Sequence, residues 1–102
     1  MTHKYDIRKT LHDPSTGLIT KITFSLVTEE GDNYWHVKHE FNLTGSPSDA
    51  GFIAFNDLTQ SDIEGFIDTY LGKSTIESSH SASLATHIES LVYSEDLPPN
   101  LQ

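Results

Sequence analysis

Histidines and carboxylates are the residues of this chain whose chemistry could be concentrated into a site. Residues 34–41 read YWHVKHEF, which places two histidines three positions apart and a glutamate directly after the second. Imidazole and carboxylate groups are common ligands of transition metals, so one hypothesis for this stretch is half of a metal site. An HxxH pair converges on one ion from the face of a helix, so the secondary structure of the stretch decides the question.

The periodicity of this stretch predicts a strand. Trp35, His39 and Phe41 fall on one set of alternate positions, and His36 and Glu40 fall on the other. Neighbouring side chains of a strand point to opposite faces, so the two histidines diverge and are poorly placed to share an ion. We therefore expect His39 to be an imidazole at the edge of the core with one hydrogen bond, and His36 to be exposed.

Two further histidines lie in the second half of the chain. His80 and His87 are seven positions apart, which places them on one face of a helix but about 10 Å apart along its axis. That separation is too large for one shared ion, and the chain has no cysteine to build a structural zinc site. We expect the six histidines not to converge, and we predict no metal and no cofactor.

The sequence carries no recognisable catalytic motif. It has no GxGxxG, no Walker loop, no GxSxG and no HExxH, and its many serines have no recognisable nucleophile context. We therefore predict that the protein is not an enzyme, and we assign no catalytic, cofactor-binding or metal-binding residue.

The charge of the chain is unevenly distributed. The formal net charge is −9; residues 1–45 carry five bases against six acids, whereas residues 46–102 carry one base against nine acids. This balance argues against nucleic-acid binding, which requires cations to displace phosphate counterions. The acidic half is either a solvated face or a surface that suits a basic partner. The candidate interaction surface consists of the acids around the first predicted helix: Asp57, Asp62, Glu64 and Asp68.

Residues 4–43 are predicted to be rich in strands. Residues 18–28, LITKITFSLVT, alternate between two sets of side chains and are rich in β-branched residues, as in a half-buried strand. Residues 44–57 form a loop, within which FIAF (52–55) is either a brief fourth strand or an extended segment packed on the sheet. The apolar residues of the first strand fall on alternate positions: Tyr5, Ile7 and Leu11.

A first helix is predicted over about residues 60–71. Thr59 and Asp62 have the spacing of a capping box at its start, and apolar residues then recur at helical spacing. Gly72 is expected to end the helix in a left-handed conformation.

A second helix is predicted over about residues 75–92. Ser74 and Glu77 form an S-x-x-E capping box at its start. Residues 94–102 hold two prolines and are predicted to be an extended tail. The helix would contact the sheet through Leu84, Ile88 and Leu91.

The fold class predicted from these elements is α+β, in a single domain over residues 1–93. An antiparallel meander of three or four strands is followed by a C-terminal helical hairpin packed on one face of the sheet. A chain of 102 residues, 35% of them hydrophobic, supports one modest core. On the third strand, the alternation predicts that two residues are buried and two are more exposed: Trp35 and Phe41, and Tyr34 and Lys38, respectively.

Residues 52–72 read FIAFNDLTQSDIEGFIDTYLG and follow a strand-rich half that contains TGLITKITFSL. This combination resembles a family of small proteins of tailed bacteriophages, cyanophages among them, with the pattern F-I-P-F/Y-x-x-L-T-E-E-x-V-x-G-W-V-x-x-x-L-G. Phe66 stands in place of the family's tryptophan, and Ala54 departs at its proline. The second helix departs widely from the family. The matching positions are Phe52, Ile53, Phe55, Leu58, Thr59, Gly65, Leu71 and Gly72.

The resemblance implies a phage origin and a non-enzymatic role. The leading hypothesis is a bacteriophage structural or accessory protein that contacts other phage proteins, as a small virion component. The alternative is an acidic, host-directed inhibitor that occupies a basic or nucleic-acid-binding cleft. A small metal- or ligand-binding module that uses histidines is the third. We expect protein partners, with a homo-oligomer among the candidates, no nucleic acid and no membrane, and localisation in the virion or the host cytoplasm.

Overall fold

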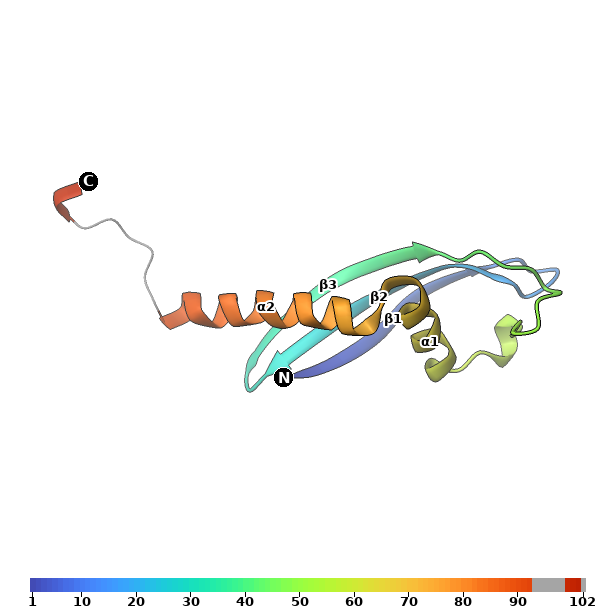
Figure 1. Cartoon of the computed structure of the whole chain (residues 1–102), viewed down its shortest axis with the longest axis horizontal. Helices are drawn as coiled ribbons and strands as arrows, with labels where there is room; N and C mark the ends of the chain where they lie inside the picture. The colour runs from blue at the N-terminus through green and yellow to red at the C-terminus, as the bar shows by residue number, and fades with distance from the viewer. Residues whose placement is uncertain (93–98, 102) are drawn as a thin grey trace.

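The computed structural model describes residues 1–92 and 99–101 of the chain. Three antiparallel strands form one sheet in the order β1-β2-β3, and two α-helices follow them (Figure 1). This arrangement confirms the predicted α+β class. Most of the tail predicted over residues 94–102 lies outside the described residues, and Pro99–Leu101 form a short 3-10 helix, η2, where an extended chain was expected.

The sheet is a meander of three long strands, the lower of the two predicted numbers. β1 spans Thr2–His12, β2 spans Ile19–Glu30 and β3 spans Asn33–Asn42. β2 and β3 are joined by a two-residue turn at residues 31–32, where Gly31 has a φ of 60°. Glycine adopts this conformation without steric cost, so the two strands are joined by a tight hairpin.

A bulge in β1 reverses the faces of its second half. The pairing with β2 runs regularly as far as Ile7, then skips Arg8 and resumes at Lys9. One extra residue moves every later side chain to the opposite face. Leu11 is therefore on the outer face and 42% exposed, so the prediction that it shares a face with Tyr5 is wrong.

The segment 52–55 is not a fourth strand. Its last residue, Phe55, begins the 3-10 helix η1 (Phe55–Asp57), and the Phe55 ring stacks on the His12 ring at a centroid distance of 3.9 Å. The Phe55 amide donates a hydrogen bond of 2.9 Å to the carbonyl oxygen of Gly17. A side chain at Gly17 would crowd that amide, since an ideal Cβ would lie 3.1 Å from it. The segment therefore packs against the β1–β2 turn and the end of β1, which is close to the second alternative but does not place it across the sheet.

The core is centred on one face of β2. Ile22, Phe24, Leu26 and Thr28 are fully buried on that face, as the alternation predicted for residues 18–28 requires over this part of the strand. At the start of the strand the buried residue is Ile19, because the pairing shifts register beside it.

The first helix, α1, spans Gln60–Leu71 and begins as predicted. The Thr59 hydroxyl accepts a hydrogen bond from the Asp62 amide, and the Asp62 carboxylate accepts one from the Thr59 amide, so the capping box is confirmed. Ile67 is fully buried against the β2 core. Gly72 has the expected positive φ of 76°, but its ψ of 102° lies outside the left-handed helical region, so the chain leaves α1 at an angle.

The second helix, α2, spans Lys73–Val92 and starts directly after Gly72. The Lys73 amide donates to the Asp68 carboxylate at 2.9 Å, and Ser74 lies within the first turn. The Glu77 carboxylate accepts a hydrogen bond from the Tyr5 hydroxyl and not from the Ser74 amide, as a capping box would require. The predicted Ser74–Glu77 capping box is therefore wrong, because the sheet competes for Glu77.

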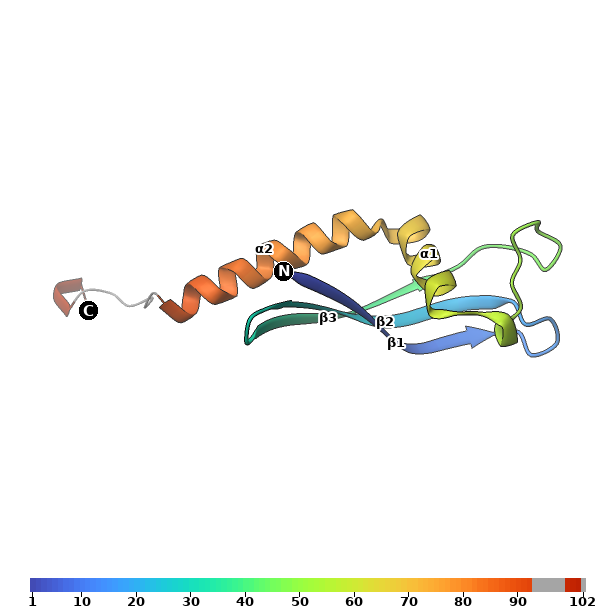
Figure 2. The ribbon, with the colours of Figure 1, turned by 90° about the horizontal axis from the view of Figure 1, so that it is seen from below.

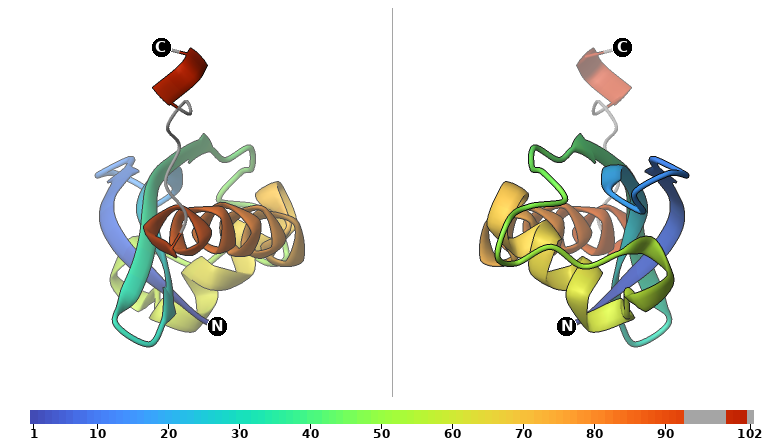
Figure 3. Two further views of the ribbon diagram at one scale, coloured as in Figure 1. Left: turned by 90° about the vertical axis from the view of Figure 1, so that its left-hand side faces the viewer. Right: turned by 90° about the vertical axis from the view of Figure 1, so that its right-hand side faces the viewer.

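Both helices lie on the same side of the sheet, as predicted (Figures 2 and 3). α1 rises from the sheet, and α2 turns at Gly72 and runs back over β2 and β3. The opposite, outer face has no helix on it among residues 1–92 and 99–101. Within the same described residues, neither helix has the length and apolar character that a membrane crossing demands.

The core thins along α2. Leu84 is fully buried, but α2 continues past the β2–β3 turn, where the sheet ends (Figure 1). Leu91 is 63% exposed, so the predicted contact of Leu91 with the sheet is wrong. On β3, Phe41 is buried and Tyr34 is 59% exposed, which confirms the predicted faces. Trp35 lies on the helix side, opposite Thr28, but it is only half-buried, so the prediction that it is buried is met only in part. Its ring lies 6.0 Å from the His87 ring of α2 between centroids.

Candidate functional site

The acids of the candidate interaction surface are largely engaged within the chain. Asp62 accepts hydrogen bonds from both the amide and the hydroxyl of Thr59, each at 3.0 Å. Asp57 lies in η1 and is exposed, so it remains directed to solvent.

The other two acids bind the start of α2. A Glu64 carboxylate oxygen lies 3.1 Å from the Lys73 ammonium, and a Gln60 side-chain amide donates to the other oxygen at 3.2 Å. Asp68 accepts the Lys73 amide. These contacts fasten α1 to α2, so this surface presents fewer free charges than its composition suggests.

A pair of imidazoles lies between β3 and α2, with His80 buried and His39 half-buried. The Nε2 atoms of His39 and His80 are 2.9 Å apart, and the His39 ring stacks on Phe24 at a centroid distance of 5.2 Å. One nitrogen must donate and the other accept, so at least one ring is neutral. Burial lowers the pKa of both rings, and for His80 the neighbouring His39 and His3 lower the pKa further.

The convergence of His39 and His80 corrects the expectation that the histidines stay apart. The alternation of β3 placed His39 with the core residues of the strand, and the helical spacing placed His80 and His87 on one face of their helix. Their meeting depends on the turn at Gly72, whose angle no local pattern encodes. His80 is 4% exposed, and its Nδ1 has no hydrogen-bond partner among the described residues.

A polar cluster links the sheet to the first turns of α2 and consists of His3, Tyr5, Thr28 and Glu77. The Tyr5 hydroxyl donates a hydrogen bond of 2.5 Å to the Glu77 carboxylate, and burial together with that carboxylate raises the pKa of Tyr5. His3 Nδ1 lies 2.9 Å from the Thr28 hydroxyl, and His3 Nε2 lies 3.9 Å from Glu77. The Lys73 ammonium sits 4.8 Å from the centre of the Tyr5 ring.

This polar cluster is built to hold the helix on the sheet. The Ser81 hydroxyl is 3.5 Å from His3 Nε2, but the other nitrogen of His3 faces the Thr28 hydroxyl and not a carboxylate, so the third member of a catalytic triad is missing. Among residues 1–92 and 99–101, no three histidine or acidic side chains are grouped to hold a metal ion. His36, on the outer face, stacks beside Tyr34 at 5.8 Å, as the strand prediction required.

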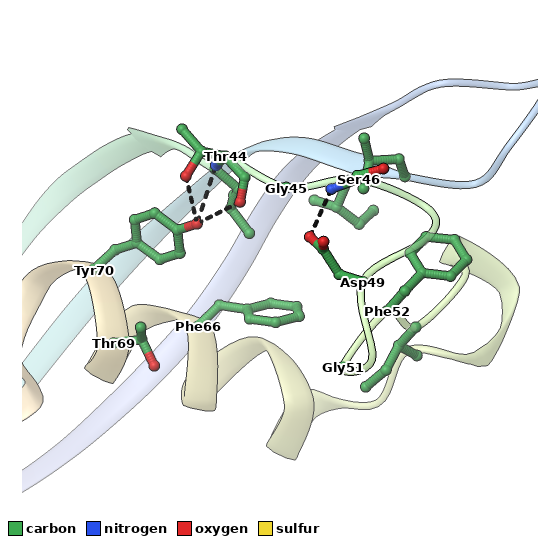
Figure 4. Close-up of a pocket in the computed structure, with 13 residues that line it drawn as sticks. Thr44, Gly45, Ser46, Asp49, Gly51, Phe52, Phe66, Thr69 and Tyr70 are labelled. Atoms are coloured by element: carbon green, nitrogen blue, oxygen red, sulfur yellow. Dashed lines mark hydrogen bonds between the residues drawn. The ribbon is translucent and has the colours of Figure 1, made fainter.

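An apolar pocket lies between α1 and the loop of residues 44–57 (Figure 4). Its volume is about 300 Å³. The Tyr70 hydroxyl donates to the Thr44 carbonyl oxygen at 2.9 Å and accepts from the Thr44 amide at 3.0 Å, which clamps one end of the loop to α1. The Phe66 ring projects from α1 toward the loop (Figure 4). The apolar and aromatic lining consists of Leu18, Ile19, Leu43, Phe52, Ile53, Phe66 and Tyr70.

Sequence reasoning did not find this pocket. Gly, Ser, Pro and Asp in residues 44–51 predicted a loop, which is correct, but composition does not say what a loop covers. The available signal was the apolar run that follows the loop, which needs a surface to pack on. The Asp49 carboxylate accepts a hydrogen bond of 2.8 Å from the Ser46 amide, so the polar side of the pocket is internally satisfied.

Comparison with known proteins identifies a family. A family model described as "Domain of unknown function (DUF7936)" matches residues 1–98. No curated protein and no solved structure matches the chain. The matched range contains the sheet, both α-helices and the pocket.

Proposed function

The chain belongs to the DUF7936 family of domains of unknown function, and we propose that it is a non-enzymatic bacteriophage structural or accessory protein that binds other proteins. The bacteriophage assignment is supported by the resemblance of residues 52–72. The binding role is supported by the pocket. Such a protein would reside in the virion or in the host cytoplasm.

The observation that carries the binding role is the apolar lining of the pocket. Phe52, Phe66 and Tyr70 present aromatic surface, and the carboxylate of Asp49 is already bonded to the loop. A volume of about 300 Å³ lies at the lower end of the range for ligand sites, which suits one or two large side chains. The partner that fits is an extended segment of another phage protein that carries an aromatic or aliphatic residue.

The proposal is tested by the protein content of purified particles. Mass spectrometry of virions should find the chain at a fixed copy number. Thr69→Arg should reduce that copy number severalfold, because Thr69 is exposed on α1 at the pocket and a charged side chain there would obstruct the apolar opening.

Thr86→Arg is a matched control. Thr69 and Thr86 are both exposed helical threonines whose hydroxyls bond the carbonyl four residues earlier, at 3.0 Å and 3.1 Å. The control variant should be incorporated like the wild type. Equal incorporation of both variants would contradict the role of the pocket in partner binding. Absence of the wild-type protein from particles would contradict a structural role in the virion.

The inhibitor remains the second candidate because of one observation, the net charge of −8 over residues 46–102, from one base and nine acids. Three of the acids around α1 keep their charge but are held by neighbouring groups of the chain, so they are less free to turn toward a partner: Asp62, Glu64 and Asp68. A pull-down from host lysate that recovers a nucleic-acid enzyme at low salt, and loses it at high salt, would favour this candidate.

A further inference from the structure

The two edges of the sheet differ in how they are protected. β1 has a bulge at Arg8 and a second irregularity near its end. Bulges in an edge strand hinder the addition of another strand. β3 pairs with β2 without interruption over residues 33–42, and this range contains neither proline nor glycine. β3 is therefore the edge that can accept another strand.

The geometry of the β2–β3 turn determines which main-chain groups of β3 face the free edge of the sheet. In a two-residue hairpin, the residues that flank the turn form a hydrogen-bonded pair, and such pairs alternate along an antiparallel ladder. Glu30 pairs with Asn33, so the odd-numbered residues of β3 bond to β2. The even-numbered residues direct their amide and carbonyl groups to the free edge: Tyr34, His36, Lys38, Glu40 and Asn42.

No other part of the described chain satisfies this edge. In residues 1–92 and 99–101 the sheet has β3 at its margin, and none of the loop, turn or cap hydrogen bonds ends on an even-numbered main-chain group of β3. The side chains beside the edge include exposed Tyr34 and Val37, which is 37% exposed. A regular and unpaired edge of ten residues favours association through strand addition.

We propose that β3 pairs antiparallel with β3 of a second copy of the chain, about a two-fold axis at His39, to give a continuous six-stranded sheet. In this register Lys38 lies opposite Glu40 of the second copy, and Glu40 lies opposite Lys38. Two ion pairs form across the axis, in addition to the ion pair of 2.7 Å that Glu40 makes with Lys21 of its own chain. Both positions belong to the even-numbered set, so they also make the main-chain hydrogen bonds.

The other self-pairings near the strand centre are less favourable. An axis at Lys38 would place two lysines opposite each other, and like charges in opposite positions destabilise a sheet. An axis at Val37 would place Lys38 opposite His36, which gives no ion pair. Because the axis is perpendicular to the sheet, the helices of both copies lie on the same side, and both outer faces form one helix-free surface. This inference uses a different surface from the pocket and does not depend on it.

Sedimentation equilibrium of the full chain tests the pairing. The wild type should show a monomer–dimer equilibrium. Lys38→Glu should weaken dimerisation at least about tenfold, because it creates two Glu–Glu oppositions, and Lys38→Glu combined with Glu40→Lys should restore most of the affinity. Lys9→Glu, on the β1 edge, should leave the equilibrium unchanged. A wild type that is monomeric at all concentrations, or a Lys38→Glu variant that dimerises like the wild type, overturns the proposal.

Cysteine cross-linking tests the register in a chain that has no cysteine of its own. The axis at His39 places residue 36 opposite residue 42 of the second copy, at a separation that a disulfide spans. The variant with His36→Cys and Asn42→Cys should form covalent dimers on mild oxidation. His36→Cys alone should not, since its two copies would lie six residues apart along the strands, about 20 Å. Cross-linking of the single variant in place of the double variant overturns the register.

Discussion

The inner face of the sheet has two halves, and they are built from different side chains. Beneath α1 the contacts are apolar, with Ile22, Phe41 and Ile67 in one buried cluster. Beneath α2 they are largely polar, with His39 bonded to His80 and with other bonds linking the helix to β1. An apolar cluster stabilises the fold with little dependence on pH, whereas buried imidazoles make the second half sensitive to it.

This difference matches the way each helix is held. α1 contributes a fully buried Ile67 to the main cluster. α2 has its buried residues, His80 and Leu84, outside that cluster. Hydrogen bonds depend on direction more than apolar contacts do, so the polar half fixes the position of α2 on the sheet. The apolar half should therefore determine how stable the protein is, and the polar half where α2 lies.

The largest effect is expected in the apolar half, from Phe24→Ala. Phe24 is fully buried and contacts the rings of Tyr5, His39 and Phe41, so its loss leaves a cavity at the junction of both halves. The free energy of unfolding should fall by about 3–5 kcal/mol in urea titrations. If that variant does not fold, Ile67→Val should still lower the value by about 0.5–1.5 kcal/mol. No loss from either change would contradict the assignment of the core.

A smaller effect is expected from Trp35→Ala, at the far end of the polar half. The residue points to the helix side, but it is only half-buried, so less apolar surface is lost than at Phe24. The free energy of unfolding should fall by about 1–2 kcal/mol, below the range expected for a fully buried aromatic residue. A loss as large as that of Phe24→Ala would show that α2 covers Trp35 more closely in solution.

The sequence predicted the apolar half better than the polar half. The central buried row of β2, the faces of Tyr34 and Phe41 on β3 and the cap at Thr59 depend on neighbours within a few residues, and these are confirmed. The bulge at Arg8 was missed because it depends on the pairing with β2 and leaves no mark on the spacing of Tyr5 and Leu11. The polar contacts of α2 and the pocket depend on the angle at Gly72 and on the loop path, which are tertiary properties.

The third prediction concerns the pH dependence of the polar half. Burial lowers the folded-state pKa of His39 and His80, whereas the unfolded chain has the ordinary value near 6.5. Above pH 6.5 neither state takes up a proton at these rings, so the full stability is present. As the pH falls through 6.5 the unfolded chain binds protons that the folded chain resists, so stability falls until the lowered folded-state pKa values are reached.

Urea titrations at pH 7.5 and pH 5.5 measure this effect. The wild type should lose stability between the two values, and His80→Met, which keeps a side chain of similar size without a titrating group, should lose less. His36→Gln is the control, because His36 is exposed on the outer face, and it should behave like the wild type. Equal losses in the wild type and in His80→Met would show that the buried pair does not govern the pH response.

The smallest effect is expected outside both halves, from Glu64→Gln combined with Asp68→Asn. The Glu64–Lys73 ion pair is about one-third exposed on each side, and pairs of that kind contribute about 0–1 kcal/mol. The asparagine that replaces Asp68 keeps an oxygen that can accept the Lys73 amide, so most of the contact at the start of α2 survives. The free energy of unfolding should therefore fall by no more than about 1 kcal/mol, and in the particle assay that tests the proposed function the double variant should behave like the wild type. A loss of several kcal/mol would mean that α2 is held by its first turn more than by the polar contacts beneath it. If the double variant kept its stability but lost partner binding, Glu64 and Asp68 would belong to the interaction surface that the sequence predicted.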